Sequence, residues 1–205
     1  MGVDERVRPS GRGDTEDMRP FLTIPIRPVF TLSMPRSRTA WFAAYLNGLG
    51  IPAYHEAWKY AKNAKELREL WNGHDLVVNS DSCNILFYDE IRQEFPEAQF
   101  IKINRSLEEV KRSAELAYGE IDETILDRWY SILQKLPADR EVEFEEWGPG
   151  QSYELVRFIT DKWIDMNWHT LAHDLKIEVN LERVFKDHIL VSSGAVDHIT
   201  AKLRG

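Results

Sequence analysis

The chain has 205 residues, a formal net charge of −8 and 43% hydrophobic residues. This length suits one compact α/β domain, and the hydrophobic content is enough for a packed core, which excludes global disorder. No stretch approaches the roughly 20 consecutive apolar residues that cross a membrane, and the acidic balance argues against nucleic-acid binding. Cys83 is the only cysteine, so a disulfide framework or a cysteine-based zinc site cannot form. We therefore expect a cytoplasmic protein in which any anion site comes from local clustering of Arg and Lys.

Residues 1–20 alternate Arg with Asp and Glu among Gly and Pro, and they offer almost nothing to bury. We expect a flexible leader over 1–20 and a single folded domain over 21–205.

From residue 28 onward, short apolar runs alternate with amphipathic segments. The pattern predicts strands at 29–33, 51–54, 76–78 and 100–103, and helices at 37–47, 61–71, 85–95 and 106–117. Two further helices are expected at 122–136 and 152–175, with the acidic run 141–146 between them as a solvated face, a last strand at 177–179 and a terminal helix at 195–203. Strand–helix alternation with short turns predicts a parallel sheet wrapped by helices, followed by a helical C-terminal half.

Cationic and hydroxyl side chains gather at two strand-to-helix turns, residues 33–41 and 102–106, with Lys111, Arg112 and Ser113 on the helix behind the second. In an open parallel sheet, ligands bind at the carboxyl ends of the strands. A helix N-terminus supplies fixed N–H donors and a positive dipole, and guanidinium groups add charge, which suits phosphate or sulfate. We expect an anion with two phosphate-like groups; the alternative is that Arg36 and Arg38 are solvated loop charges.

The run LSMPRSRTAW, residues 32–41, resembles the first nucleotide-binding loop of sulfotransferases, usually Pro-Lys/Arg-Ser-Gly-Thr-Thr-Trp/Leu, and the bacterial branch in particular. The stretch FPEAQFIKINR, residues 95–105, resembles the family's second motif, in which an Arg ends a strand and a Ser follows eight residues later; Arg105 and Ser113 have that spacing. The two motifs with the elements between them cover about residues 29–117. The resemblance implies a three-layer P-loop-like α/β fold and the donor 3′-phosphoadenosine 5′-phosphosulfate (PAPS), with no metal.

The resemblance also assigns roles to individual residues. Arg36 would contact the transferring sulfuryl group and the bridging oxygen. The 5′-phosphate would be held by Ser37, Thr39 and the local amides. Trp41 matches a position that can stack on adenine, although a buried helix position is the alternative for this side chain, and Arg105 with Ser113 would bind the 3′-phosphate.

The first loop departs from the family pattern at two positions. Arg38 stands where the family has Gly, which often lets the backbone approach a phosphate or adopt a positive φ. Either the Arg38 side chain points outward or the loop is remodelled and loses donor affinity. Ala40 replaces the second Thr and removes one hydroxyl.

A general base must take the proton of the acceptor. In many bacterial members a Glu after the first helix does this, which favours Glu56 here; the adjacent His55 is an alternative because imidazole titrates near neutral pH. If the strand continues through both residues, only one of them faces the site. Asp81 is a third candidate, and an exposed salt bridge is the alternative role for each carboxylate.

The sequence thus predicts transfer of a sulfuryl group from PAPS to a hydroxyl or amine of a small molecule or carbohydrate. A nucleotide-dependent kinase is a second hypothesis, weakened because Gly-x-x-x-x-Gly-Lys-Ser/Thr is absent. A non-catalytic binding or scaffolding descendant of the fold is a third hypothesis.

His169 and His173 have a spacing that can bind zinc, with Asp174 as a third possible ligand. The glutamate that follows the first histidine in metalloproteases is absent, so we expect ordinary surface or core residues.

Overall fold

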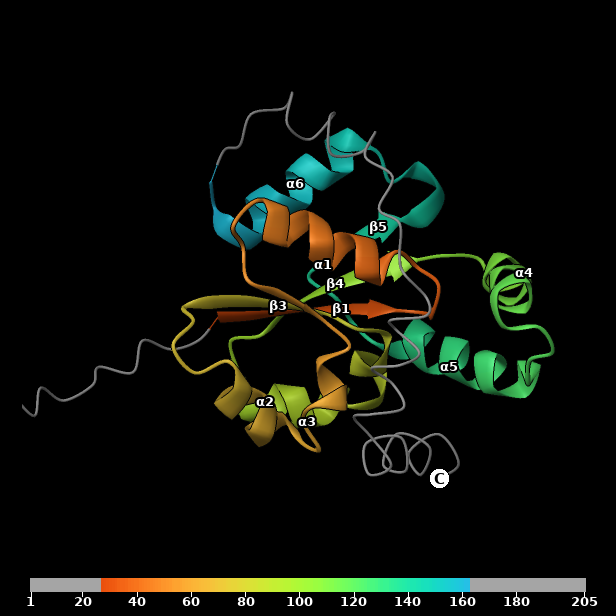
Figure 1. Ribbon diagram of the computed structural model, residues 1–205, viewed down its shortest axis with the longest axis horizontal. Helices are drawn as coiled ribbons and strands as arrows, with labels where there is room; N and C mark the ends of the chain where they lie inside the picture. Colours follow the sequence, from red (N-terminus) through yellow and green to blue (C-terminus); the bar gives the residue numbers. More distant parts are fainter. Residues whose placement is uncertain (1–26, 163–205) are drawn as a thin grey trace, which may run out of the picture.

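The computed structural model describes residues 27–162. Its centre is a five-stranded sheet in the order β2-β3-β1-β4-β5, and every neighbouring pair is parallel. The strands are β1 (Arg27–Ser33), β2 (Ala53–His55), β3 (Leu76–Ser80), β4 (Gln99–Asn104) and β5 (Arg140–Glu143). Because all strands run the same way, their carboxyl ends meet at one edge of the sheet (Figure 1).

Helices cover both faces of the sheet and make three layers (Figure 1). One face is covered by α1 (Thr39–Gly48) and α6 (Pro149–Thr160), and the other by α2 (Ala64–Leu70), α3 (Tyr88–Glu94) and α5 (Glu123–Lys135). Helix α4 (Leu107–Tyr118) follows β4, and its N-cap Ser106 accepts a hydrogen bond from Glu109 N at 3.2 Å. Short 3₁₀ turns lie at η1 (Ala57–Lys59), η2 (Ser82–Leu86) and η3 (Phe144–Glu146).

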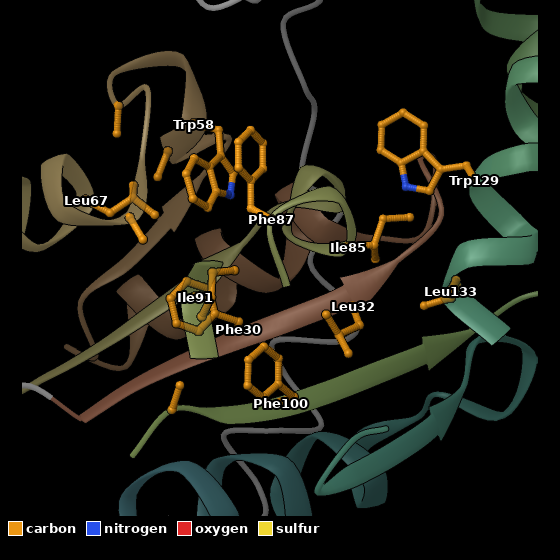
Figure 2. Close-up of a cluster of buried hydrophobic side chains, with 14 of the residues drawn as sticks. Phe30, Leu32, Trp58, Leu67, Ile85, Phe87, Ile91, Phe100, Trp129 and Leu133 are labelled. Atoms are coloured by element: carbon orange, nitrogen blue, oxygen red, sulfur yellow. The ribbon is translucent and has the colours of Figure 1, made fainter. Parts of the chain in front are cut away.

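The central strands are apolar on both faces because a helix layer covers each side. Phe30 and Phe100 face the layer of α2, α3 and α5, where they stack with ring centroids 5.7 Å apart (Figure 2). Val29 and Ile101 face α1 and α6. This two-sided burial explains the near-continuous apolar runs in the sequence, and the predicted α/β fold with a central parallel sheet flanked by helices is confirmed.

The acidic run 141–146 is not only a solvated face, as expected from its charge. Its first residues belong to β5, in which Val142 alone is buried, and Phe144–Glu146 form η3. A short edge strand with charged side chains gives no hydrophobic alternation to detect. The expected helix at 85–95 is divided into η2 and α3, and α6 begins earlier than expected, at Pro149. The expected strand at 177–179 and terminal helix at 195–203 lie outside the described residues.

Candidate functional site

The loop that joins β1 to α1 carries two arginines with left-handed backbone. Arg36 has φ 66° and Arg38 has φ 61°, and Arg38 is the N-cap of α1. For an L-residue this conformation costs roughly 1–2 kcal/mol relative to the right-handed region. Arg38 therefore keeps the backbone conformation that glycine adopts freely, and its side chain is exposed. The left-handed backbone is thus kept without glycine, and the effect of Arg38 on donor affinity stays a prediction.

Polar groups at the start of α1 are left for a ligand. The N-cap makes no side-chain hydrogen bond, so N–H groups of the first turn have no partner within the helix. The hydroxyls of Ser33 and Ser37 are completely buried and have no hydrogen-bond partner. A buried hydroxyl without a partner costs about 1–3 kcal/mol, which favours an occupant that can bond to it. Unpartnered donors, a helix N-terminus and nearby arginines together fit a phosphate or sulfate group.

The loop is supported from β3 by residues that the sequence reasoning missed. Ser80 Oγ donates to the Thr39 carbonyl at 2.8 Å, and Ser82 Oγ donates to the Met34 carbonyl at 3.2 Å. Their position at the end of the buried strand β3 could have indicated this role, because the carboxyl end of β3 lies beside the loop that follows the neighbouring strand β1. Thr39 itself is buried, and Ala40 is half-buried.

The two turns that the sequence singles out meet in space. Arg105, which follows β4, donates from Nη1 to the Arg36 carbonyl. Arg36 donates from Nε to Ser113 Oγ of α4 at 3.3 Å, and its guanidinium lies 5.7 Å from the ring centroid of Tyr118. Arg36, Arg105 and Ser113 therefore form one contiguous group at the carboxyl edge of the sheet.

Arg38 and Arg105 share an aromatic neighbour, Phe144, which the sequence reasoning did not single out. Their guanidinium carbons lie 4.8 Å and 4.0 Å from its ring centroid. Arg38 Nη1 also donates to the Trp147 carbonyl at 2.9 Å. Partial burial lowers the pKa of Arg105, Glu145 and Glu109 oppose that shift, and the positive charges of Arg36 and Arg38 add to it. The cationic cluster is thus held against the β5–α6 connection, where Phe144 within the acidic run and Trp147 directly after it were the available signal.

Trp41 lies on the first turn of α1 and is half-buried. Its ring stacks on Tyr45 at a centroid distance of 4.9 Å and meets Trp147 edge-on at 5.7 Å. It lies close to Arg38 in the sequence and contacts the aromatic residue to which Arg38 bonds. Trp41 therefore borders the cationic cluster and packs against the helix layer as well.

His55 and Glu56 meet, although strand alternation predicts that they point apart. Strand β2 ends at His55, and Glu56 takes a left-handed conformation with φ 58°, which breaks the alternation. His55 Nε2 lies 3.6 Å from Glu56 Oε1, and Glu56 also forms an ion pair with Lys59. His55 Nδ1 lies 2.9 Å from the Ser80 carbonyl, so Nδ1 carries the hydrogen and Nε2 holds the lone pair in the neutral ring.

Asp81 is buried beneath this pair and acts on the backbone. Its carboxylate accepts from Cys83 N at 2.9 Å and from Trp58 N at 3.4 Å, and only 2% of the residue is exposed. Burial raises the pKa of Asp81, while the Cys83 hydrogen bond and the nearby His55 lower it. Asp81 therefore caps η2 and is closed to an acceptor molecule.

The cations on the outer part of α4 are engaged elsewhere. Lys111 pairs with Glu123 and Asp127 of α5, each at 2.8 Å, and Arg112 pairs with Glu109 at 2.5 Å. Of the cationic residues at the second turn and on α4, Arg105 is the one that contacts the loop.

A pocket of about 410 Å³ lies at the opposite edge of the sheet, where β4 and β5 begin, and its lining includes Gln99, Arg140 and Arg157. It is therefore separate from the loop.

Residues 27–162 contain no group of His, Cys, Asp or Glu side chains arranged to hold a metal ion, and none of their helices is long and apolar enough to cross a membrane. His169, His173 and Asp174 lie outside the described residues.

A comparison with protein families shows which family this chain belongs to. The model of the sulfotransferase domain family matches residues 28–190. The chain belongs to this family. No curated protein matches the sequence.

This sulfotransferase-domain protein is also similar to solved kinases. A sugar kinase from Janibacter sp. HTCC2649 is 14% identical, with 67% of this chain and 95% of that chain covered and a TM-score of 0.49. Shikimate kinase from Bacteroides thetaiotaomicron is 13% identical, with 66% and 99% covered and a TM-score of 0.47. A gluconokinase from Sinorhizobium meliloti 1021 is 13% identical, with 80% and 99% covered and a TM-score of 0.43. Similarity at this level supports no conclusion about function.

Proposed function

We propose that this sulfotransferase-domain protein transfers a sulfuryl group from PAPS to a hydroxyl or amine of a small-molecule or carbohydrate acceptor. The observation that carries the proposal is the contact between Arg105 and the Arg36 carbonyl, which joins the two predicted anion-binding turns. The family match supports the reaction class, and the buried, unpartnered hydroxyl of Ser37 supports an anionic occupant at the same place.

The chain's own groups divide the donor between two anion sites. Ser37, Thr39 and the N–H groups at the start of α1 would hold the 5′-phosphate. Arg105 and Ser113 would hold the 3′-phosphate, and Trp41 would border the adenine. Because Arg36 Nε bonds to Ser113 Oγ here, that bond must give way when both groups bind to a ligand.

When bound, the donor supplies the sulfuryl group, which leaves a phosphate oxygen for the acceptor's oxygen or nitrogen. Arg36 would stabilise the negative charge that develops on the leaving oxygen once its guanidinium has turned from Ser113 toward the donor. The positive φ of Arg36 and the hydrogen bond from Arg105 to its carbonyl hold this residue in place.

We assign removal of the acceptor's proton to His55 Nε2, with Glu56 beside it. The Ser80 carbonyl fixes the tautomer in which Nε2 is basic. Glu56 is ion-paired with Lys59 and lies 3.6 Å from His55 Nε2, so in this assignment its carboxylate would stabilise the imidazolium that forms. The assignment of Glu56 as the base is the first alternative, and Asp81 is the candidate that its burial supports least.

The test compares nucleotides on the full chain. PAP, the donor without its sulfuryl group, should raise the melting temperature, whereas ATP with Mg²⁺ should not. Transfer of radiolabelled sulfuryl from PAPS to a panel of sugars, phenols and amines then tests turnover. Stabilisation by ATP with Mg²⁺ alone would favour the kinase hypothesis. Stabilisation by PAP with no transfer to any member of the panel would favour a non-catalytic descendant.

A further inference from the structure

Arg38 carries a larger structural role than its place in the loop suggests. Its guanidinium bonds to the Trp147 carbonyl at 2.9 Å and lies 4.8 Å from the Phe144 ring centroid. Both partners belong to the connection between β5 and α6, more than 100 residues away in the sequence. A solvated loop charge would not hold two such contacts.

The partners of Arg38 are themselves fixed. Trp147 is buried, and its Nε1 donates to Ser152 Oγ of α6 at 2.9 Å. Phe144 packs at the margin of the core cluster between the sheet and α6. Arg38 therefore attaches the loop to a rigid part of the fold.

The same attachment reaches Arg105. The Phe144 ring that contacts Arg38 also lies 4.0 Å from the guanidinium carbon of Arg105, and Arg105 bonds back to the Arg36 carbonyl, two residues from Arg38. Arg38, Phe144, Arg105 and the loop thus form a closed ring of contacts. Removing one member frees the others to move.

We propose that Arg38 is a positioning residue that fixes the loop and Arg105 through Phe144 and Trp147. The proposal rests on the proposed function, because the consequence is tighter binding of the 3′-phosphate that Arg105 would hold. Arg38 does not contact the nucleotide in this role, since its guanidinium is already engaged with protein groups.

A double-mutant cycle tests this role, with PAP and AMP as probes and calorimetric titration as the measurement. R38A should weaken PAP binding roughly fivefold to tenfold, less than removal of Arg105 itself, because Arg38 acts only by positioning. AMP lacks the 3′-phosphate, so its binding should weaken less than that of PAP, because only the contribution of the loop is lost. In R38A/R105A the loss should equal that of R105A alone, because the two side chains act through one contact.

R38K separates positioning from charge. Lys keeps the positive charge but loses the planar group that lies against Phe144. R38K should therefore resemble R38A, and the loss should persist at high salt. Full PAP affinity in R38K, or multiplicative losses in R38A/R105A, would overturn the proposal.

A double-mutant cycle on Arg38 and Phe144, measured without ligand, tests the contact between them independently of nucleotide binding. The wild type, R38A, F144A and R38A/F144A are unfolded in urea, and the two single changes should be non-additive. If the wild type fails to bind PAP, the proposed function fails while this cycle still reports on the contact. Additive changes in this cycle would overturn the positioning role even if PAP binds.

Discussion

The guanidinium of Arg105 donates to the backbone carbonyl of Arg36, although 69 residues separate them in the chain. This bond links the carboxyl end of β4 to the loop after β1, the neighbouring strand in the sheet. Two turns that would otherwise be independent become one site, so a change in either should affect the binding of a ligand that spans both.

Arg105→Ala should abolish the stabilisation by PAP. The variant loses a charged hydrogen-bond donor, and such bonds contribute about 1.5–3 kcal/mol, which corresponds to a roughly 10-fold to 150-fold loss of affinity. The measurement is the melting temperature with and without PAP. Arg112→Ala is the matched control, because Arg112 lies on α4, the helix that follows Arg105, and pairs with Glu109. An equal loss in both variants would point to general electrostatics.

Ser37→Ala should separate stability from binding. Without ligand, removal of a buried hydroxyl that has no partner should leave the free energy of unfolding unchanged or raise it by up to about 1 kcal/mol. PAP affinity should fall roughly fivefold. Urea unfolding with and without PAP measures both effects.

Ser106→Ala gives the opposite pattern and serves as the control for Ser37→Ala. Its hydroxyl caps α4, so the variant should lose about 1 kcal/mol of stability and keep its affinity for PAP. If Ser37→Ala destabilises the ligand-free protein and binds PAP normally, Ser37 does not belong to the site.

His55→Gln should lower kcat by about 100-fold or more, the usual contribution of a general base, and leave PAP affinity within about twofold. Glu56→Gln should lower kcat less, because it removes only the charge beside the imidazolium. The measurement is the rate of sulfuryl transfer to the best acceptor at saturating PAPS. A large loss in Glu56→Gln with normal turnover in His55→Gln would make Glu56 the base.

Asp81 should make stability depend on pH. Its folded-state pKa is raised by burial, so the folded protein binds more protons than the unfolded chain in the window above the unfolded pKa of about 3.9. Stability from this group is therefore present at low pH and is lost as the pH rises through that window. The stability of the wild type relative to Asp81→Asn should fall as the pH rises above about 4 in urea unfolding. Parallel profiles for the two proteins would contradict the assignment.

Periodicity was sufficient to predict the central sheet. Strands β1, β3 and β4 are buried on both faces, so their apolar runs are unmistakable, and the helices between them show clear amphipathic spacing. β5 escaped detection because Val142 is its one buried side chain, and its other contacts are backbone pairing with β4 and polar bonds from Glu141 and Glu143.

The candidate site was predictable only in part. The arginines and serines of the loop stand next to each other in the sequence, and the resemblance to sulfotransferases linked them to Arg105 and Ser113. Phe144 and Trp147 come from a segment whose charge masks its packing, and their contacts with Arg38 depend on tertiary structure. The contact between His55 and Glu56 depends on a left-handed residue that no alternation rule anticipates.

The charged character of β5 has a consequence for how molecules of this protein meet one another. β5 lies at an edge of the sheet, and three of its four residues expose Arg or Glu side chains. Such an edge repels a second copy that would add its own strand. Replacing the exposed Glu143 with valine should therefore promote ordered self-association, which light scattering would detect.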